Sequence, residues 1–136
     1  MKCLCHSQKD YNACCKTIHE GEAAESPERL MRARYCAYAK GFVDFIIESS
    51  AQALRKKIEK SEGIESWKSG ILAFSQTTEF YGLEIIEAKK DQVIFKAFLR
   101  SKAKDQKKID MSFQEKSFFI KEPMWRYLSG EVSKIN

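Results

Sequence analysis

Hydrophobic positions in the first half of the chain recur at the spacing of α-helices. One apolar face is formed by Met31, Tyr35 and Tyr38 and is continued by Phe42 and Phe45. Ser26 followed by Pro27 is typical of a helix start, because serine caps free amides and proline fits the first turn, and Gly41 is typical of a helix end. The pattern predicts helices over residues 27–40, 42–48, 51–60 and 64–74.

The second half of the chain changes character after Thr77. Aromatic and β-branched residues now gather in short segments separated by turn signals, with Pro123 marking the last hairpin turn and residues 102–108 the one before it. The pattern predicts strands over residues 81–88, 92–102, 109–121 and 124–132. Helices followed by strands indicate an α+β domain with an antiparallel sheet and helices over one face.

Composition limits the possible fold of the chain more than it limits the possible functions. A chain of 136 residues with 43% hydrophobic content can build one real core. Its apolar runs are shorter than the roughly 18 residues of a membrane helix, and no secretion or lipidation signal is seen, so we expect a soluble, cytoplasmic protein that does not bind membranes.

The net charge of +5 leaves nucleic acid open as a partner without favouring it. Two basic clusters lack the interleaved aromatic residues that stack on bases, so we interpret them as solvated faces. The clusters are Arg55, Lys56, Lys57 and Lys60, and Lys102, Lys104, Lys107 and Lys108.

Four cysteines within the first fifteen residues carry the clearest chemical signal: Cys3, Cys5, Cys14 and Cys15. Four thiolates so close in sequence can converge on one tetrahedral metal ion, and zinc is the ion that most commonly takes four sulfurs. Disulfides would require an oxidising compartment, and a bridge between the neighbours Cys14 and Cys15 would be strained. Catalytic thiols usually occur singly beside a base or as C-x-x-C pairs. We therefore predict a structural Zn²⁺ site, with His6 and His19 as bystanders.

Cys3-x-Cys5-x8-Cys14-Cys15, with Ser7, Lys9 and Tyr11 between the pairs, resembles the SEC-C motif, a zinc-binding element also found at the carboxyl end of the SecA translocation ATPase. The usual form reads C-P-C-G-S-G-K-x-Y-x-x-C-C. Here Leu4, His6 and Gln8 replace the proline and two glycines, which affects the turn geometry because glycine reaches positive φ without strain. The resemblance to SecA implies a protein-binding role, toward the ribosome or a chaperone.

A second resemblance covers the rest of the chain. The segment from Glu28 to Phe45, the Gly82-Leu83-Glu84 strand, the strand around Glu115-Lys116-Ser117 and the Trp125-Arg126-Tyr127 strand are similar to the YchJ family. That family implies a nuclear transport factor 2-like fold, in which a curved sheet wraps a helix and leaves a conical cavity. It divides the chain into a SEC-C element over residues 1–22 and a YchJ-like domain over residues 23–136.

Two departures from that family concern possible sites. Gln114 stands where many relatives have histidine, and a second SEC-C motif at the end of longer relatives has no counterpart in the 136 residues. We expect the missing motif to remove one candidate interaction site. The resemblance also leaves a homodimer through the open sheet face as an alternative to a monomer.

The strand around Glu115 offers an internal candidate site. Alternation places Phe113, Glu115, Ser117 and Phe119 on one face and their neighbours on the other. If the first set faces inward, Glu115 needs a cation, and Arg34 on the apolar side of the first helix is the predicted partner in an ion pair. Tyr35 and Tyr38 are candidate hydroxyl donors in the same cavity, as in ketosteroid isomerases. An arginine partner would weaken Glu115 as a base, which favours a structural bridge or an anion pocket over catalysis. Cys36 should turn away and pack as a thiol.

Three functions remain open. The first is a non-enzymatic adaptor that binds a protein through a zinc-stabilised SEC-C element. The second is a small-molecule carrier or enzyme that uses the cavity groups Arg34, Glu115, Tyr35 and Tyr38. The third is a weak nucleic-acid binder that uses the zinc element and the lysine clusters.

Overall fold

Helices precede strands along the chain, as the sequence pattern predicts. The computed structural model describes residues 1–102 and 108–135. Its helical elements are η1 (Tyr11–Ala13), α1 (Cys15–His19), α2 (Pro27–Lys40), α3 (Val43–Glu48), α4 (Gln52–Ser61) and α5 (Ile64–Thr77). The strands are β1 (Thr78–Lys89), β2 (Gln92–Ser101), β3 (Phe113–Lys121) and β4 (Trp125–Ser133). The prediction of an α+β domain with an antiparallel sheet is confirmed.

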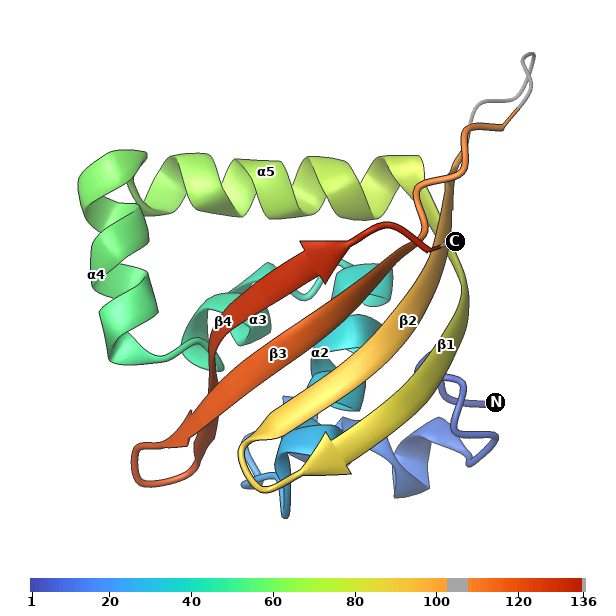
Figure 1. Cartoon of the computed structure of the whole chain (residues 1–136), viewed down its shortest axis with the longest axis horizontal. Coiled ribbons are helices and arrows are strands. Elements are labelled where there is room, and N and C mark those ends of the chain that lie inside the picture. The colour runs from blue at the N-terminus through green and yellow to red at the C-terminus, as the bar shows by residue number, and fades with distance from the viewer. Residues whose placement is uncertain (103–107, 136) are drawn as a thin grey trace.

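The strands form one curved antiparallel sheet in the order β1-β2-β3-β4. Figure 1 shows α2 against the concave side of this sheet and α5 running across one end of it. The register places Phe95 opposite Glu115 and Ser117 opposite Gly130, so the middles of β2, β3 and β4 line the same concave surface. A curved sheet that packs on helices at only some points leaves room for a cavity.

Helix α2 is the centre of the fold because three of its sides are buried. Leu30, Met31 and Tyr35 pack against the sheet residues Val93, Phe95, Ala97, Leu99 and Phe119. Ala33 and Cys36 pack against the amino-terminal cysteines, and Ala37 packs against Ile46 of α3 and Ile71 of α5. The amino-terminal element, the sheet and the other helices therefore all meet on this one helix.

Both predicted ends of α2 are confirmed. The side chain of Ser26 accepts a hydrogen bond from the amide of Arg29 at 3.2 Å, and Pro27 occupies the first turn. Gly41 ends the helix in the left-handed region at φ 77°. Glycine suits this position because it reaches positive φ without strain, and a Cβ there would also lie close to the side-chain oxygen of Ser75, at 3.3 Å.

Some predicted boundaries are wrong. Helix α5 continues to Thr77 and passes directly into β1, because Thr78 is the first extended residue. Strand β3 begins at Phe113 rather than at residue 109, since the side chain of Ser112 bonds to the backbone of Leu99 and leaves Asp110 with an isolated bridge to Arg100. Phe42 does not continue the apolar face, because 40% of it is exposed.

Candidate functional site: a four-cysteine cluster and an aromatic cavity

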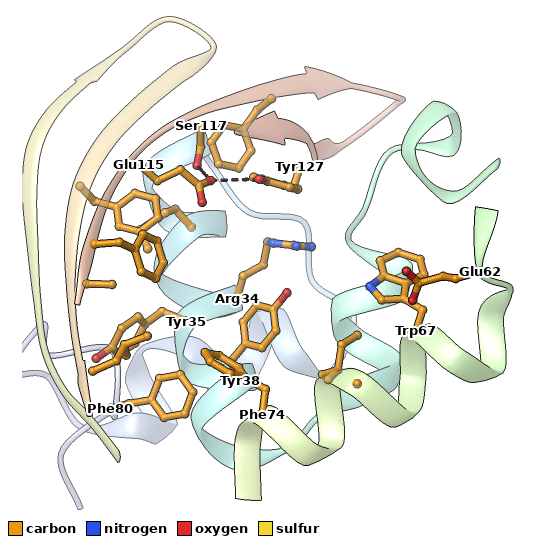
Figure 2. A pocket seen from close by; sticks show the side chains of 18 residues that line it. Arg34, Tyr35, Tyr38, Glu62, Trp67, Phe74, Phe80, Glu115, Ser117 and Tyr127 are labelled. Carbon is orange, nitrogen blue, oxygen red and sulfur yellow. Dashed lines mark hydrogen bonds between the residues drawn. The ribbon is translucent and has the colours of Figure 1, made fainter. Parts of the chain in front are cut away.

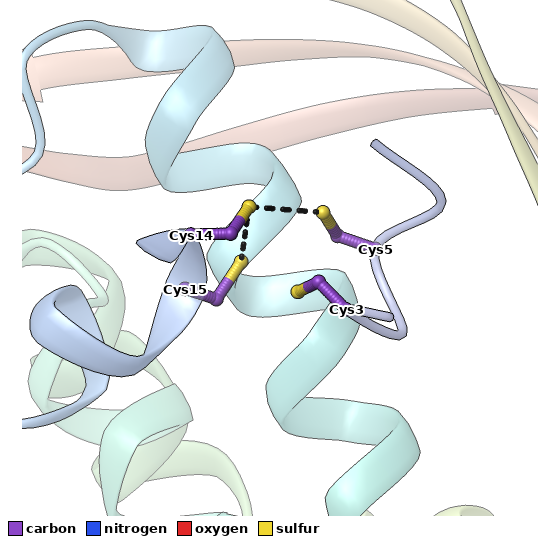
Figure 3. Close-up of side chains that lie close together, drawn as sticks. All are labelled: Cys3, Cys5, Cys14 and Cys15. Carbon is purple, nitrogen blue, oxygen red and sulfur yellow. Dashed lines mark hydrogen bonds between the residues drawn. The ribbon is translucent and has the colours of Figure 1, made fainter. Parts of the chain in front are cut away.

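The four amino-terminal cysteines converge in space. Cys3 and Cys5 come from the first loop, while Cys14 and Cys15 come from the junction of η1 and α1 (Figure 3). All four side chains are buried, and their sulfur atoms lie within 4.8 Å of one another. The cysteines are free rather than disulfide-bonded. Such a cluster can hold a metal ion.

The spacing of the sulfur atoms matches a tetrahedral ion. With metal–sulfur bonds of about 2.3 Å, a regular tetrahedron has sulfur–sulfur edges of about 3.8 Å. The Sγ atoms of Cys5 and Cys14 are 3.6 Å apart, and those of Cys14 and Cys15 are 3.9 Å apart. These two spacings, with all four sulfur atoms within 4.8 Å of one another, fit a four-coordinate ion.

Two arginines of α2 fasten the cysteine loops to the rest of the protein. Arg29 donates to the carbonyl of Cys14 at 3.0 Å and to its sulfur at 3.6 Å, and Arg32 donates to the carbonyl of Cys5 at 3.0 Å. Ser7 adds a hydrogen bond to the sulfur of Cys14 at 3.2 Å. These cationic and polar donors favour a cluster that carries negative charge, as four thiolates on a divalent ion do.

The histidines lie outside the sulfur cluster, in agreement with the sequence-based expectation. Nε2 of His19 donates to the carbonyl of Ala33 at 2.8 Å, and Nδ1 accepts from the hydroxyl of Tyr11 at 2.8 Å. Burial lowers the pKa of His19, which keeps this ring neutral. The ring of His6 contacts the carbonyl of Phe80 at 3.3 Å. Both rings therefore help to dock the amino-terminal element.

Cys36 is a fifth buried thiol beside the cluster. It turns away from the sheet, as expected, and packs with the four cysteines. Its sulfur lies 3.8 Å from that of Cys3, a neighbourhood that the sequence did not predict. The contact arises only because α2 packs against the first loop.

His6 and Gln8, at the two glycine positions of the usual SEC-C form, have a left-handed backbone conformation that suits glycine. Their φ angles are 62° and 72°, in the left-handed region that non-glycine residues rarely enter. The two side chains are therefore accommodated at a cost in backbone strain. Since the side chain of Gln8 is exposed, its replacement removes little packing.

We expect Gln8→Gly to stabilise the protein by about 1 kcal/mol, because glycine reaches the same φ without the Cβ clash. Thermal unfolding of the metal-loaded protein measures the effect. Lys9→Gly is the matched control: Lys9 has no positive φ, so glycine there should lower stability. If Gln8→Gly and Lys9→Gly changed the stability equally, backbone strain at Gln8 would be contradicted.

A cavity of about 390 Å³ lies between the concave side of the sheet and helices α2 and α5 (Figure 2). Its walls are mainly aromatic and aliphatic, and the exposed lining residues Glu62 and Gly70 place its mouth near the α4–α5 corner. All four predicted cavity residues, Arg34, Glu115, Tyr35 and Tyr38, line it. Their role in binding stays a prediction.

Glu115 presents its carboxylate to this cavity from the middle of β3. The alternation expected from the sequence is found, since Phe113, Glu115, Ser117 and Phe119 all line the cavity. Ser117 and Tyr127 both donate to the same carboxylate oxygen, Oε2, and the distance from the Tyr127 hydroxyl is 2.9 Å. Burial and the neighbouring Glu115 charge raise the pKa of Tyr127, so its hydroxyl stays a donor.

The predicted ion pair between Arg34 and Glu115 is wrong. Nη1 of Arg34 donates to the carbonyl of Ile46 at 3.0 Å, to Ser49 at 2.7 Å and to Ser50 at 3.2 Å. The guanidinium lies over the ring of Tyr127, 4.4 Å from its centre. Arg34 thus meets neutral acceptors at the α3 end, while Tyr127 contacts Arg34 with its ring and Glu115 with its hydroxyl (Figure 2). Sequence spacing predicts that the side chains of Arg34 and Glu115 both face the cavity. It does not show which partners the two side chains point toward.

The hydroxyl groups differ from those expected. Tyr35 donates to the carbonyl of Gly82 at 2.8 Å and so fastens α2 to β1, which leaves it unavailable to Glu115. Tyr38 lines the cavity from α2. The hydroxyl that reaches Glu115 belongs to Tyr127, which was not among the predicted site residues. Alternation along β4 predicts that Tyr127 faces inward, but only the pairing of β4 with β3 brings its hydroxyl to Glu115.

Gly130 makes room for the carboxylate. A Cβ at this position would lie 2.3 Å from Oε2 of Glu115 and 2.6 Å from the hydroxyl of Tyr127. We expect Gly130→Ala to displace both groups and to destabilise the protein by about 1–2 kcal/mol. Urea unfolding measures this change. Gly70→Ala on α5 is the control, because its Cβ meets nothing within 4 Å and alanine favours helix by about 1 kcal/mol. A Gly130→Ala protein as stable as the original would contradict the close contact.

The basic clusters are only partly described. Lys56, Lys57 and Lys60 are exposed on α4, as expected for a solvated face. In the second cluster, Lys102 is exposed and Lys108 pairs with Glu79. Lys104 and Lys107 lie outside the described residues. Among the described helices, none is long and apolar enough to cross a membrane.

Comparison with known proteins finds a family model and relatives that cover most of the chain. The sequence model of the family described as "YchJ, middle NTF2-like domain" matches residues 26–130. A UPF0225 protein of Vibrio cholerae is 34% identical over 96% of this chain and 83% of its own length. A UPF0225 protein of Shewanella sp. (strain MR-4) is 30% identical over 94% of this chain and 79% of its own length.

Two solved structures resemble the whole chain. The solution structure of a SEC-C motif containing protein from Rhodopseudomonas palustris has a TM-score of 0.73 and 26% identity, covering all of both chains. The crystal structure of a SEC-C motif containing protein from Psychrobacter arcticus has a TM-score of 0.68 and 22% identity, covering all of this chain and 85% of the other. The nuclear transport factor 2-like fold predicted for the α+β domain, with a SEC-C cysteine cluster beside it, is confirmed.

Proposed function

The chain belongs to the YchJ family, and from that premise we propose that it is a binding protein in which one structural zinc ion supports a small-molecule cavity. The observation that carries the binding function is the cavity of about 390 Å³, which falls within the range of ligand pockets. Apolar walls with a few convergent polar groups, here Glu115, Ser117 and Tyr127, are typical of such pockets. No catalytic residues are assigned in this proposal.

Zinc is the proposed ion because the donor set consists of four thiolates. Soft sulfur ligands in a closed tetrahedron suit zinc better than magnesium, calcium or manganese, which prefer oxygen. A closed set has no open position for water, so the ion would hold structure rather than activate a nucleophile. Metal analysis of the purified protein should give one zinc per chain. Another metal, or none in protein purified without chelator, would contradict this assignment.

A neutral fluorescent probe can test the cavity without assuming a ligand. We expect N-phenyl-1-naphthylamine to bind zinc-loaded protein with one-to-one stoichiometry. Ala97→Leu should abolish this binding, because the Ala97 side chain is buried on the cavity wall and a larger side chain takes the space. Ala73→Leu on the exposed side of α5 is the control. If the probe binds equally to Ala97→Leu, or if neither the probe nor a smaller apolar compound binds, the cavity is not the ligand site.

A protein-docking role for the amino-terminal element is the second candidate. Leu4 is 40% exposed although it lies between the buried ligands Cys3 and Cys5, and the exposed cations Lys2 and Lys9 flank it. An ordered apolar side chain within a cationic rim suits recognition of an acidic protein surface. Partners retained from lysate should be lost both after zinc removal and in the Leu4→Asp protein. A partner set unchanged by both treatments would exclude this element from the interaction.

Cytoplasmic localisation and weak nucleic-acid binding are two further proposals. Five free, buried cysteines suit a reducing compartment. Nucleic-acid binding rests on the positive net charge and on the exposed lysines of α4. Lack of binding to DNA and RNA at low salt, where these contacts are strongest, would remove it.

A further inference from the structure

We propose that the cavity selects small apolar amines, with the ligand ammonium group on the free oxygen of Glu115 and the apolar body between the aromatic walls. This inference rests on the proposed ligand-binding function of the cavity. It specifies the head group that the cavity prefers, which the presence of a cavity alone does not.

The two oxygens of Glu115 have different surroundings. Oε2 accepts from both Ser117 and Tyr127, which fixes the carboxylate in place. The second oxygen points into the cavity, and no hydrogen bond to it is formed by the described part of the chain (Figure 2). Glu115 also has no ion-pair partner among those residues. A preorganised acceptor with no compensating cation is complementary to a cationic donor.

Arg34 is the cation that lines the cavity, and its hydrogen bonds are made through one nitrogen atom. Its Nη1 atom is shared by the carbonyl of Ile46 and the hydroxyls of Ser49 and Ser50, and the ring of Tyr127 covers one face of the guanidinium. Figure 2 shows the guanidinium directed away from Glu115. These bonds direct Nη1 toward α3, whereas no cation pairs with the Glu115 carboxylate in the described part of the chain. We therefore place the ligand ammonium group at Glu115, and an anion on the remaining N–H groups of Arg34 is the alternative that the acid probe tests.

The rest of the cavity favours the same ligand. Rings of Phe74, Phe80, Phe113 and Phe119 line it, and the negative faces of aromatic rings attract ammonium groups. Glu62 near the mouth adds a second carboxylate. The volume of about 390 Å³ lies at the lower end of the range for ligand pockets, which suits a small aromatic body.

Three probes with one phenyl ring and different head groups test the inference: 2-phenylethylamine, 2-phenylethanol and 3-phenylpropionate. Titrations at pH 7 on unmodified, zinc-loaded protein, followed by the NMR shifts of cavity residues, give the affinities. We expect the amine to bind about tenfold more tightly than the alcohol, because a charge-assisted hydrogen bond is stronger than a neutral one, and the acid to bind most weakly. An alcohol that matches the amine, or an acid that binds best, would overturn the inference.

Variants assign the preference to Glu115. Glu115→Gln should remove the tenfold advantage of the amine and leave the affinity for the alcohol within about twofold, since the amide keeps the shape without the charge. Glu84→Gln is the control, because Glu84 is exposed on β1 and does not line the cavity. An amine preference that survives Glu115→Gln would overturn the assignment, and the head-group series on unmodified protein decides if this variant does not fold.

The neutral probe separates failure of this inference from failure of the proposed function. If N-phenyl-1-naphthylamine binds but the amine has no advantage, the inference is wrong and the binding function stands. If neither the neutral probe nor any phenyl compound binds, both are wrong.

Discussion

Cys5→Ser is expected to destabilise the protein by roughly 5 kcal/mol, the largest effect of any single change considered. Structural zinc contributes apparent values of about 10–16 kcal/mol in zinc-finger peptides, and part of that energy should remain here through the contacts of the amino-terminal element with α2. Cys5 is fully buried among the other thiols, so an incomplete ligand set would leave polar sulfurs without compensation. Thermal unfolding should shift by roughly 15 °C. Removal of the metal from unmodified protein with a chelator should have the same effect.

Cys36→Ser is the matched control for this prediction. Cys36 is equally buried and lies 3.8 Å from Cys3, but it stands outside the four-sulfur ligand set. This protein should retain one zinc per chain and should lose only the small energy of a packing change. If Cys36→Ser loses the metal while Cys5→Ser keeps it, the ligand set proposed here is wrong.

Arg34→Leu is expected to destabilise the protein by about 3 kcal/mol. Arg34 is only 7% exposed, and it connects three acceptors at the end of α3 with the ring of Tyr127 on β4. Leucine fills part of the volume but removes charge-assisted hydrogen bonds, worth about 1.5–3 kcal/mol each, and the contact with the ring. The carbonyl of Ile46 keeps bonds from Ser49 and Ser50, which limits the loss. The midpoint of urea unfolding measures the change.

Lys68→Leu provides the control for charge removal. Lys68 on α5 pairs with Asp44 at 3.5 Å, where the carboxylate is largely exposed, and such surface pairs contribute between 0 and about 1 kcal/mol. A much smaller shift than that of Arg34→Leu is therefore expected. Equal unfolding midpoints for Arg34→Leu and the unmodified protein would show that the buried network adds no net stability.

The order and type of elements could be predicted from sequence because local rules determine them. The cap at Ser26, the stop at Gly41 and the alternation around Glu115 each depend on neighbouring residues, and all three are found. The boundaries that were wrong depend on distant contacts. Residues 109–111 still bond to the end of β2, but the side chain of Ser112 takes the backbone groups of Leu99 and interrupts the ladder before Phe113.

Sequence by itself determined which residues gather: four closely spaced cysteines can reach one ion, and inward positions of a helix and a strand must share a core. The tertiary structure decided which side chains contact one another. Side-chain direction depends on how α2, α3 and β4 pack, so Arg34 turned to Ser49 and Ser50, and Tyr127 reached Glu115 in its place. The same packing brought Cys36 beside Cys3. Composition and spacing carry no information on such directions, because they arise only when elements far apart in the chain meet.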